Sequence, residues 1–150
     1  MQIRARSLLV IMLAGAMAGP AAVHVAMAAD PAPAAAANAE LVSQADLLAR
    51  LERKDPDLVV LDVRTPAEYA AGHVPGARNI SHDLLSSRLA ELAPLREKQV
   101  VLYCRSGRRT LLAADVLHSA GFTRLAHLEG DYLAWEAEHR PIEREGAAAK

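Results

Sequence analysis

The reactive groups of this sequence gather around its single cysteine, Cys104, in the stretch VVLYCRSGRRTLLAAD (residues 100–115). An apolar run of strand length ends at this cysteine, and an apolar pattern typical of a helix begins a few residues later. The residues directly after Cys104 supply three cations, two hydroxyl groups and one glycine: Arg105, Arg108, Arg109, Ser106, Thr110 and Gly107. Because ligands of open α/β sheets bind beyond the carboxyl ends of the strands, this segment is predicted to form a binding site.

The predicted site suits a thiolate and an anion. Backbone N–H groups of a strand-to-helix loop can converge on one point, and a helix N-terminus adds positive potential there. Gly107 allows the tight turn that this convergence needs. A positive field favours the thiolate, which is the nucleophilic form of cysteine. The pattern therefore predicts that Cys104 attacks a negatively charged substrate. An inert core thiol would explain neither the glycine nor the position at a strand end.

Composition excludes several other classes of function. The 150 residues suit one domain with some terminal excess. A net charge of −1 and the lack of an aromatic series argue against nucleic-acid binding. One cysteine allows no intramolecular disulfide, and no histidine has a ligand spacing with it, so we expect no metal. We expect His118 and His127 on helix or strand surfaces. The oligomeric state stays open.

The N-terminal segment is typical of an export signal. A basic start with Arg4 and Arg6 precedes an apolar stretch, and Ala26 and Ala28 are the small residues of a cleavage site before Ala29. An uncleaved membrane anchor is the alternative, but glycines and a proline interrupt the apolar run. We therefore expect a signal peptide at residues 1–28, a periplasmic or secreted mature protein, and no stable membrane anchor after cleavage. An Ala/Pro-rich linker at 29–40, a folded domain at 41–145 and a disordered tail at 146–150 would follow.

The folded part alternates strand and helix patterns. Apolar runs at residues 58–63 and 99–104 predict strands covered on both faces, and weaker strands are expected near 77–80 and 123–128. Helices are expected from a cap at Ser43, from a capping box between Thr65 and Glu68, from Ser81 or His82 to Pro94, and at 108–119 and 131–140. This alternation predicts an α/β domain with a mainly parallel central sheet flanked by helices on both faces.

Three blocks of this sequence resemble the single-domain rhodanese family: LDVRTPAEYAAGHVPGARNI (61–80), CRSGRRT (104–110) and LEGDYLAWEAEHRPIE (128–143). These motifs, and equally the size and the export signal, make the chain most similar to the small periplasmic rhodanese of the bacterial phage-shock system. The resemblance implies a cofactor-free thiosulfate sulfurtransferase. Cys104 would take sulfur from thiosulfate or a similar anionic donor as a persulfide and pass it to cyanide or a thiol acceptor, in a ping-pong pattern.

The resemblance also implies roles for single residues. Cys104 matches the catalytic cysteine, and residues 105–110 match the substrate-binding loop, with Arg109 at the usual arginine position. Asp62 and Arg64 match a D-x-R pair that would fix loops by charge-assisted hydrogen bonds, and Glu68 is expected to be a partner of Arg64.

Two further matches concern segments outside the cysteine loop. The glycine- and proline-containing turn around His73 is expected to be structural. The family often carries a second glycine where this chain has Asp131 after Gly130. An aspartate at a helix start is locally favourable, so we expect no loss of activity from this departure, although it could change the rim of the site.

Two other functions compete with sulfur transfer. Phosphatases and arsenate reductases of the related cysteine-loop type need their arginine one position farther from the cysteine than Arg109 is, in a loop wide enough for a tetrahedral oxyanion. The shorter loop here suits a single persulfide sulfur. The second alternative is a non-catalytic rhodanese-like binding or sensing module, and the retained Cys104 favours catalysis over it.

Overall fold

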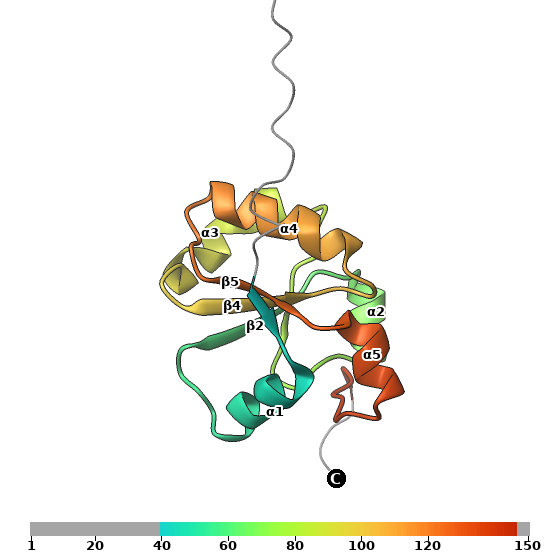
Figure 1. Ribbon diagram of the computed structural model, residues 1–150. Helices are drawn as coiled ribbons and strands as arrows, with labels where there is room; N and C mark the ends of the chain where they lie inside the picture. The colour runs from blue at the N-terminus through green and yellow to red at the C-terminus, as the bar shows by residue number, and fades with distance from the viewer. Residues whose placement is uncertain (1–39, 147–150) are drawn as a thin grey trace, which may run out of the picture. The chain divides into compact units, whose positions relative to one another are not determined.

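The computed structural model of the chain describes residues 40–146, which contain a five-stranded sheet flanked by helices (Figure 1). The strands are β1 (Glu40–Val42), β2 (Leu58–Asp62), β3 (Arg78–Asn79), β4 (Gln99–Tyr103) and β5 (Leu125–Leu128). They lie in the order β1-β5-β4-β2-β3, and each neighbouring pair is parallel. The prediction of a mainly parallel sheet is confirmed, and β4, which leads to the cysteine, is its central strand.

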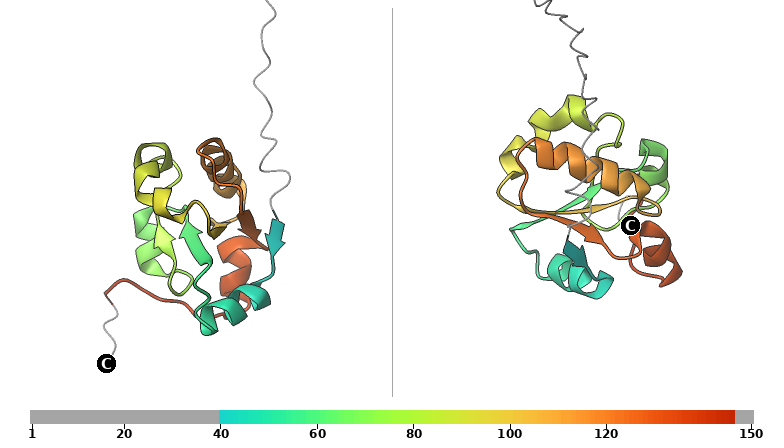
Figure 2. Two further views of the ribbon diagram at one scale, coloured as in Figure 1. Left: turned by 90° about the vertical axis from the view of Figure 1, so that its left-hand side faces the viewer. Right: turned by 45° about the horizontal axis from the view of Figure 1, so that its top comes forward.

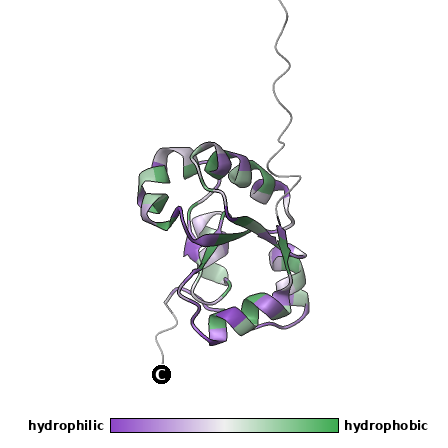
Figure 3. Cartoon of the chain, turned by 60° about the vertical axis from the view of Figure 1, so that its left-hand side comes forward, coloured by the Kyte–Doolittle hydropathy of each residue, from purple (hydrophilic) through white to green (hydrophobic). Residues whose placement is uncertain are grey.

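Helices cover both faces of this sheet, as the sequence predicts. They are α1 (Gln44–Glu52), α2 (Pro66–Ala71), α3 (Leu89–Leu92), α4 (Arg108–Ser119) and α5 (Asp131–Ala137), with the short 3-10 helices η2 (Leu85–Arg88) and η3 (Ala93–Leu95) on either side of α3. Helices α3 and α4 lie on one face, and α1 and α5 lie on the other (Figures 1 and 2). The helices carry both hydrophobic and hydrophilic segments, as expected when one side meets a sheet (Figure 3).

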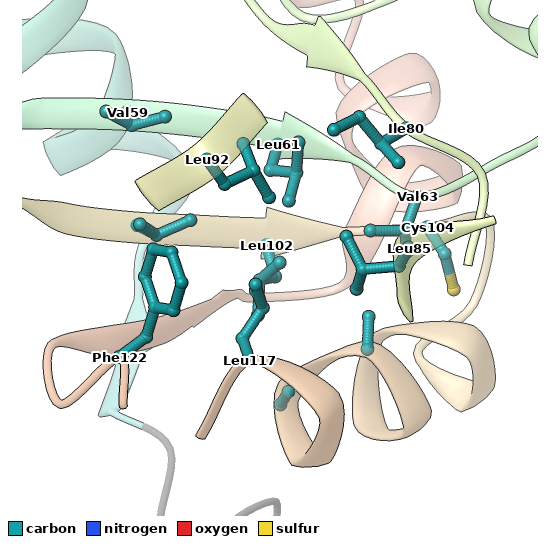
Figure 4. Packing of buried hydrophobic residues seen from close by; sticks show 13 residues of the cluster. Val59, Leu61, Val63, Ile80, Leu85, Leu92, Leu102, Cys104, Leu117 and Phe122 are labelled. Carbon is teal, nitrogen blue, oxygen red and sulfur yellow. The ribbon is translucent and has the colours of Figure 1, made fainter. Parts of the chain in front are cut away.

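The strands of the sheet bury alternate residues in two separate cores. From β4, Val100 and Leu102 enter the core beneath α4, whereas Val101 and Tyr103 enter the core beneath α1 and α5. In the first core, Leu117 and Phe122 extend toward the sheet, and the sulfur of Cys104 lies at the far end of the cluster, beyond the end of β4 (Figure 4). The alternation along β4 thus directs the cysteine side chain toward the α4 side.

Local capping signals form as the sequence predicts. The hydroxyl of Ser43 accepts a hydrogen bond from the backbone N–H of Asp46 at the start of α1. Thr65 and Glu68 form a reciprocal capping box at α2, with a proline in the first turn. These signals depend on residues three positions apart, so they do not need distant contacts to form.

Two local predictions are wrong. Glu40–Val42 is an edge strand paired with β5, whereas the sequence predicts linker up to residue 40 and no strand before the helix that Ser43 caps. So short a strand has no readable periodicity, and its partner lies far along the chain. The single helix expected from Ser81 or His82 to Pro94 is broken into η2, α3 and η3, which have no side-chain caps. Leu84 is 46% exposed, whereas Leu85 and Leu92 are buried, so the leucines of this segment do not form one continuous buried stripe.

The predicted signal peptide at 1–28, most of the linker and the last four residues of the tail lie outside the described residues. Between residues 40 and 146, no helix is long and apolar enough to cross a membrane.

The core beneath α4 leads to a stability prediction. Leu117 is fully buried, whereas Leu112 on the same helix is 51% exposed. We expect Leu117→Ala to lower the free energy of unfolding by about 2–5 kcal/mol, because it leaves a cavity between α4 and the sheet. Leu112→Ala, the matched control, should change it by no more than about 0.5 kcal/mol. Urea unfolding followed by circular dichroism measures both, and equal losses would contradict the assigned packing.

Candidate active site around Cys104

The cysteine loop connects β4 to α4 at the carboxyl edge of the sheet. Cys104 directly follows the last residue of β4, and it is 1% exposed. Its Sγ accepts a hydrogen bond from the backbone N–H of Gly107 at 3.1 Å. Gly107 has φ +95°, and a Cβ atom there would lie 3.1 Å from Asp131 Oδ2. Glycine is therefore required at this position for the loop to direct an amide at the sulfur.

The loop cations lie at different depths. Arg105 and Arg108 are exposed, together with Ser106, and they form the rim of the loop. Arg109 is half-buried in the first turn of α4. The Glu68 carboxylate raises the pKa of Arg109 well above its usual value, and Cys104 acts in the same direction. Of the three arginines, Arg109 is therefore the one whose charge acts on the sulfur from within the site.

Arg109 and Glu68 form a two-pronged ion pair between α4 and α2. Nη1 and Nη2 of Arg109 donate to Oε2 and Oε1 of Glu68 at 2.7 and 2.9 Å. These hydrogen bonds, with help from Thr65, lower the pKa of Glu68 to about 2. Guanidinium has five N–H donors, so a bound anion can still reach those that Glu68 does not use. The pair holds the cation in place without consuming it.

Arg64 pairs with Asp62, as the D-x-R match predicts, but not with Glu68. Its guanidinium donates to both carboxylate oxygens of Asp62 and to the backbone oxygen of Gly72, and its Cζ lies 3.8 Å from the ring centroid of Tyr132. The expected pairing with Glu68 is therefore wrong, because Glu68 turns to Arg109 instead. Burial alone would lower the pKa of Arg64, but Asp62 raises it above its usual value. The buried pair ties β2 to the end of α2.

Asp131 is a site residue that the sequence reasoning missed. It is 4% exposed, and its Oδ1 accepts hydrogen bonds from the Cys104 N–H at 2.8 Å and from the Thr110 hydroxyl at 3.1 Å. Its Oδ2 lies 2.8 Å from Nε2 of His127. Burial raises the pKa of Asp131, but the bonds from His127 and Cys104 lower it below its usual value overall. Its replacement of a family glycine was the one signal that could have found it.

The two histidines that were expected on helix or strand surfaces, His127 and His118, differ in burial. The prediction that His127 lies on a strand surface is wrong, because its side chain is 16% exposed and pairs with Asp131 beneath the loop. His118 on α4 is exposed, as predicted. His73 stacks on Tyr69 with ring centroids 3.7 Å apart and exchanges backbone hydrogen bonds with Glu143, so its contacts are those of the scaffold.

The arrangement joins a sulfur, an amide directed at it, a held guanidinium and the N-terminus of the twelve-residue helix α4. Such a setting stabilises negative charge on the sulfur and attracts an anion to it. No cluster of three or more His, Cys, Asp or Glu side chains that could hold a metal is found among residues 40–146. The chemistry that this site supports is attack by a thiolate on an anionic substrate.

The Glu68–Arg109 pair leads to a prediction about pH. The pKa of Glu68 falls from its ordinary 4.5 to about 2 on folding, so the stabilisation is fully present above pH 4.5 and is lost as the pH falls toward 2. We expect Glu68→Gln to be less stable than the wild type at neutral pH, with a gap that shrinks over this acid range. Free energies of unfolding from urea titrations at several pH values measure the gap.

A matched control uses an exposed pair. Glu91 pairs with Arg88 in the open, so Glu91→Gln should produce a smaller gap at neutral pH. A gap for Glu68→Gln that stays constant from neutral pH down to the acid range would contradict the assigned ion pair.

Comparisons with known proteins agree with this geometry. Residues 43–138 match the model of the rhodanese-like domain. A sulfurtransferase of Allochromatium vinosum is 37% identical over 86 residues, which cover 57% of this chain and 78% of that protein. A candidate mitochondrial thiosulfate sulfurtransferase of Schizosaccharomyces pombe is 32% identical over 92 residues, covering 54% of this chain and 65% of the yeast protein. The chain thus spans slightly less than two thirds of the second relative.

Solved structures share the fold. A rhodanese-related protein of Thermoplasma volcanium superposes with a TM-score of 0.61 at 27% identity, covering 71% of this chain and 99% of that one. A Rhodopseudomonas palustris protein of unknown function, described as a possible tyrosine phosphatase, superposes with a TM-score of 0.63 at 30% identity, covering 73% and 88%. The family match and the sulfurtransferases among the relatives support sulfur transfer in the broad sense. This chain belongs to the rhodanese-like family.

Proposed function

We propose that this protein is a thiosulfate sulfurtransferase that works through a persulfide on Cys104. The observation that carries the proposal is the Gly107 N–H directed at the Cys104 sulfur in a loop whose Arg109 is held beside it. The sulfurtransferase names of two relatives support the same chemistry. Because Cys104 is 1% exposed, the site favours a donor that presents a single terminal atom, as the outer sulfur of thiosulfate does.

The proposed reaction has two half-reactions. The Cys104 thiolate attacks the outer sulfur of thiosulfate, a new S–S bond forms, and the donor's own S–S bond breaks so that sulfite leaves with the electron pair. The terminal sulfur of the persulfide now carries the negative charge. Cyanide or a thiolate then attacks this sulfur, giving thiocyanate or a new persulfide, and the Cys104 thiolate is restored. Atoms and charge balance without an external oxidant.

Four residues of the loop have a role in this scheme. Arg105 and Arg108 at the exposed rim attract the anionic donor. Arg109 offers its remaining N–H donors to the sulfite portion as its charge develops. The Gly107 N–H stabilises the thiolate before attack, and the N-terminus of α4 favours the persulfide anion afterwards.

We also propose that the protein acts outside the cytoplasm, as the small periplasmic rhodanese of the phage-shock system does. Support comes from residues 1–28, with their basic start, apolar stretch and small residues before Ala29. Fractionation of expressing cells, with N-terminal sequencing of the mature protein, tests this. A cytoplasmic protein that still begins at Met1 would overturn it.

The central prediction concerns the persulfide. Incubation of the purified protein with thiosulfate should add the mass of one sulfur atom, located at Cys104 by peptide mapping, and Cys104→Ser should gain none. The variant should also lose thiosulfate:cyanide transfer, because a serine hydroxyl is not ionised at neutral pH. Full activity of Cys104→Ser would overturn the mechanism. An unmodified wild type without activity would favour the non-catalytic binding module.

Phosphate-ester hydrolysis is the second candidate function, because the similar structure from Rhodopseudomonas palustris is described as a possible tyrosine phosphatase. The shorter loop argues against it, because Arg109 closes a smaller cradle than a tetrahedral phosphate needs. We expect the purified protein to turn over thiosulfate with cyanide faster than p-nitrophenyl phosphate. Colorimetric assays for thiocyanate and for p-nitrophenol provide the comparison, and faster release of p-nitrophenol would reverse the ranking.

A further inference from the structure

The first residues of α5 bind the backbone of Cys104 through hydrogen bonds. The N–H groups of Tyr132 and Leu133 donate to the backbone oxygens of Cys104 and Arg105 at 3.0 and 3.2 Å. The Cys104 N–H in turn donates to the Asp131 carboxylate at 2.8 Å. Both polar groups of the cysteine backbone are therefore bound by two consecutive residues of one helix. The orientation of the cysteine depends on where α5 begins.

The carboxylate of Asp131 also joins the two ends of the cysteine loop. The oxygen that accepts the Cys104 N–H accepts the Thr110 hydroxyl at 3.1 Å as well. The other carboxylate oxygen is held by His127 of β5 and lies where a Cβ on Gly107 would touch it. One side chain thus bridges Cys104, at the start of the loop, and Thr110, in the first turn of α4, and it supports the turn between them.

The backbone of Asp131 adopts a left-handed conformation, which costs free energy for any residue with a side chain. Its φ is +53°, and Gly130 before it has φ +71°. Glycine adopts this left-handed region freely, and among other residues aspartate and asparagine tolerate it best. A second glycine, as the family often has, would fit this backbone with less strain. The hydrogen bonds from Cys104, Thr110 and His127 offset the strain in this chain.

We propose that Asp131 is a positioning residue for Cys104, which clamps both ends of the cysteine loop so that the Gly107 N–H stays directed at the sulfur. The clamp acts on the reactivity of the thiol. Its effect on sulfur transfer rests on the proposed function, but its effect on the thiol does not. The sequence analysis expects a favourable helix start, no loss of activity and an altered rim of the site at Asp131, and the proposal adds a defined role for its side chain.

Two substitutions separate the clamp from its charge. Asp131→Gly removes every hydrogen bond of the side chain and suits the left-handed backbone. Asp131→Asn keeps an oxygen for Cys104 and Thr110 and tolerates the same backbone, but it removes the negative charge and turns an NH2 donor toward His127 in place of the accepting oxygen. The other titratable groups near the sulfur are Arg109 from α4, its partner Glu68 from α2 and His127 from β5. Both variants leave the Arg109–Glu68 pair in place, whereas His127 loses its carboxylate partner in both.

The experiment measures alkylation of Cys104 by iodoacetamide as a function of pH, together with the rate of persulfide formation from thiosulfate. For Asp131→Gly we expect the midpoint of the alkylation profile to move to higher pH and persulfide formation to slow about tenfold or more, because the amide no longer stays on the sulfur. Asp131→Asn should keep the wild-type rate and a midpoint no higher than that of the wild type. The midpoint of the pH profile is compared, and not the alkylation rate itself, because a loosened loop would also raise that rate by giving iodoacetamide easier access to Cys104.

The outcomes are distinguishable. A wild-type midpoint for Asp131→Gly, or an equal loss in Asp131→Asn, would overturn the clamp. If Asp131→Gly fails to fold by circular dichroism, Thr110→Val decides, since it removes one bond of the clamp and should move the midpoint the same way by a smaller amount. A wild type that forms no persulfide while the midpoints still differ would refute the proposed function and leave the clamp standing.

Discussion

Cys104 sits at the end of the central strand with its N–H, its C=O and its sulfur each in a hydrogen bond, to Asp131, Tyr132 and Gly107 respectively. Buried polar groups must find partners, because leaving one unpaired costs free energy. These three bonds therefore fix where the loop goes, and the loop fixes where the cations lie. The Cys104 thiol at the edge of the hydrophobic core therefore keeps its orientation although the exposed Arg105 and Arg108 follow closely in the same loop.

The two ion pairs that involve α2 and its flanking residues have different roles because they are buried to different depths. Asp62 and Arg64 are buried, and their pairing joins β2 to the end of α2 and to the ring of Tyr132. Arg109 and Glu68 are half-exposed, so the guanidinium is held in one orientation while part of it remains open to an anion. Both pairs involve α2, because Arg64 binds the backbone oxygen of Gly72 at its end and Glu68 belongs to its first turn. This short helix is therefore important for the position of the cysteine loop.

Helix α5 also holds the cysteine loop in place through hydrogen bonds. Two N–H groups of its first residues donate to the cysteine segment, and the Asp131 carboxylate accepts the N–H of Cys104, so its dipole and its hydrogen bonds act where the strand ends. Residue 131 determines how firmly this contact holds. A glycine there would leave only the backbone bonds, whereas the carboxylate adds bonds to Thr110 and His127. The departure at this position lies at the centre of the site and not at its rim.

The sequence alone determined the parallel α/β architecture, the capping signals at Ser43 and Thr65, and the loop from Cys104 into α4, because these depend on periodicity and on residues a few positions apart. Only the tertiary structure decided the partners that lie far apart in the chain. Glu68 pairs with Arg109 and not with Arg64, Glu40–Val42 joins β5 as a strand, and Asp131 with His127 supports the cysteine loop. Such choices follow from how strands are ordered in the sheet, and no local pattern encodes which side chains that order brings together.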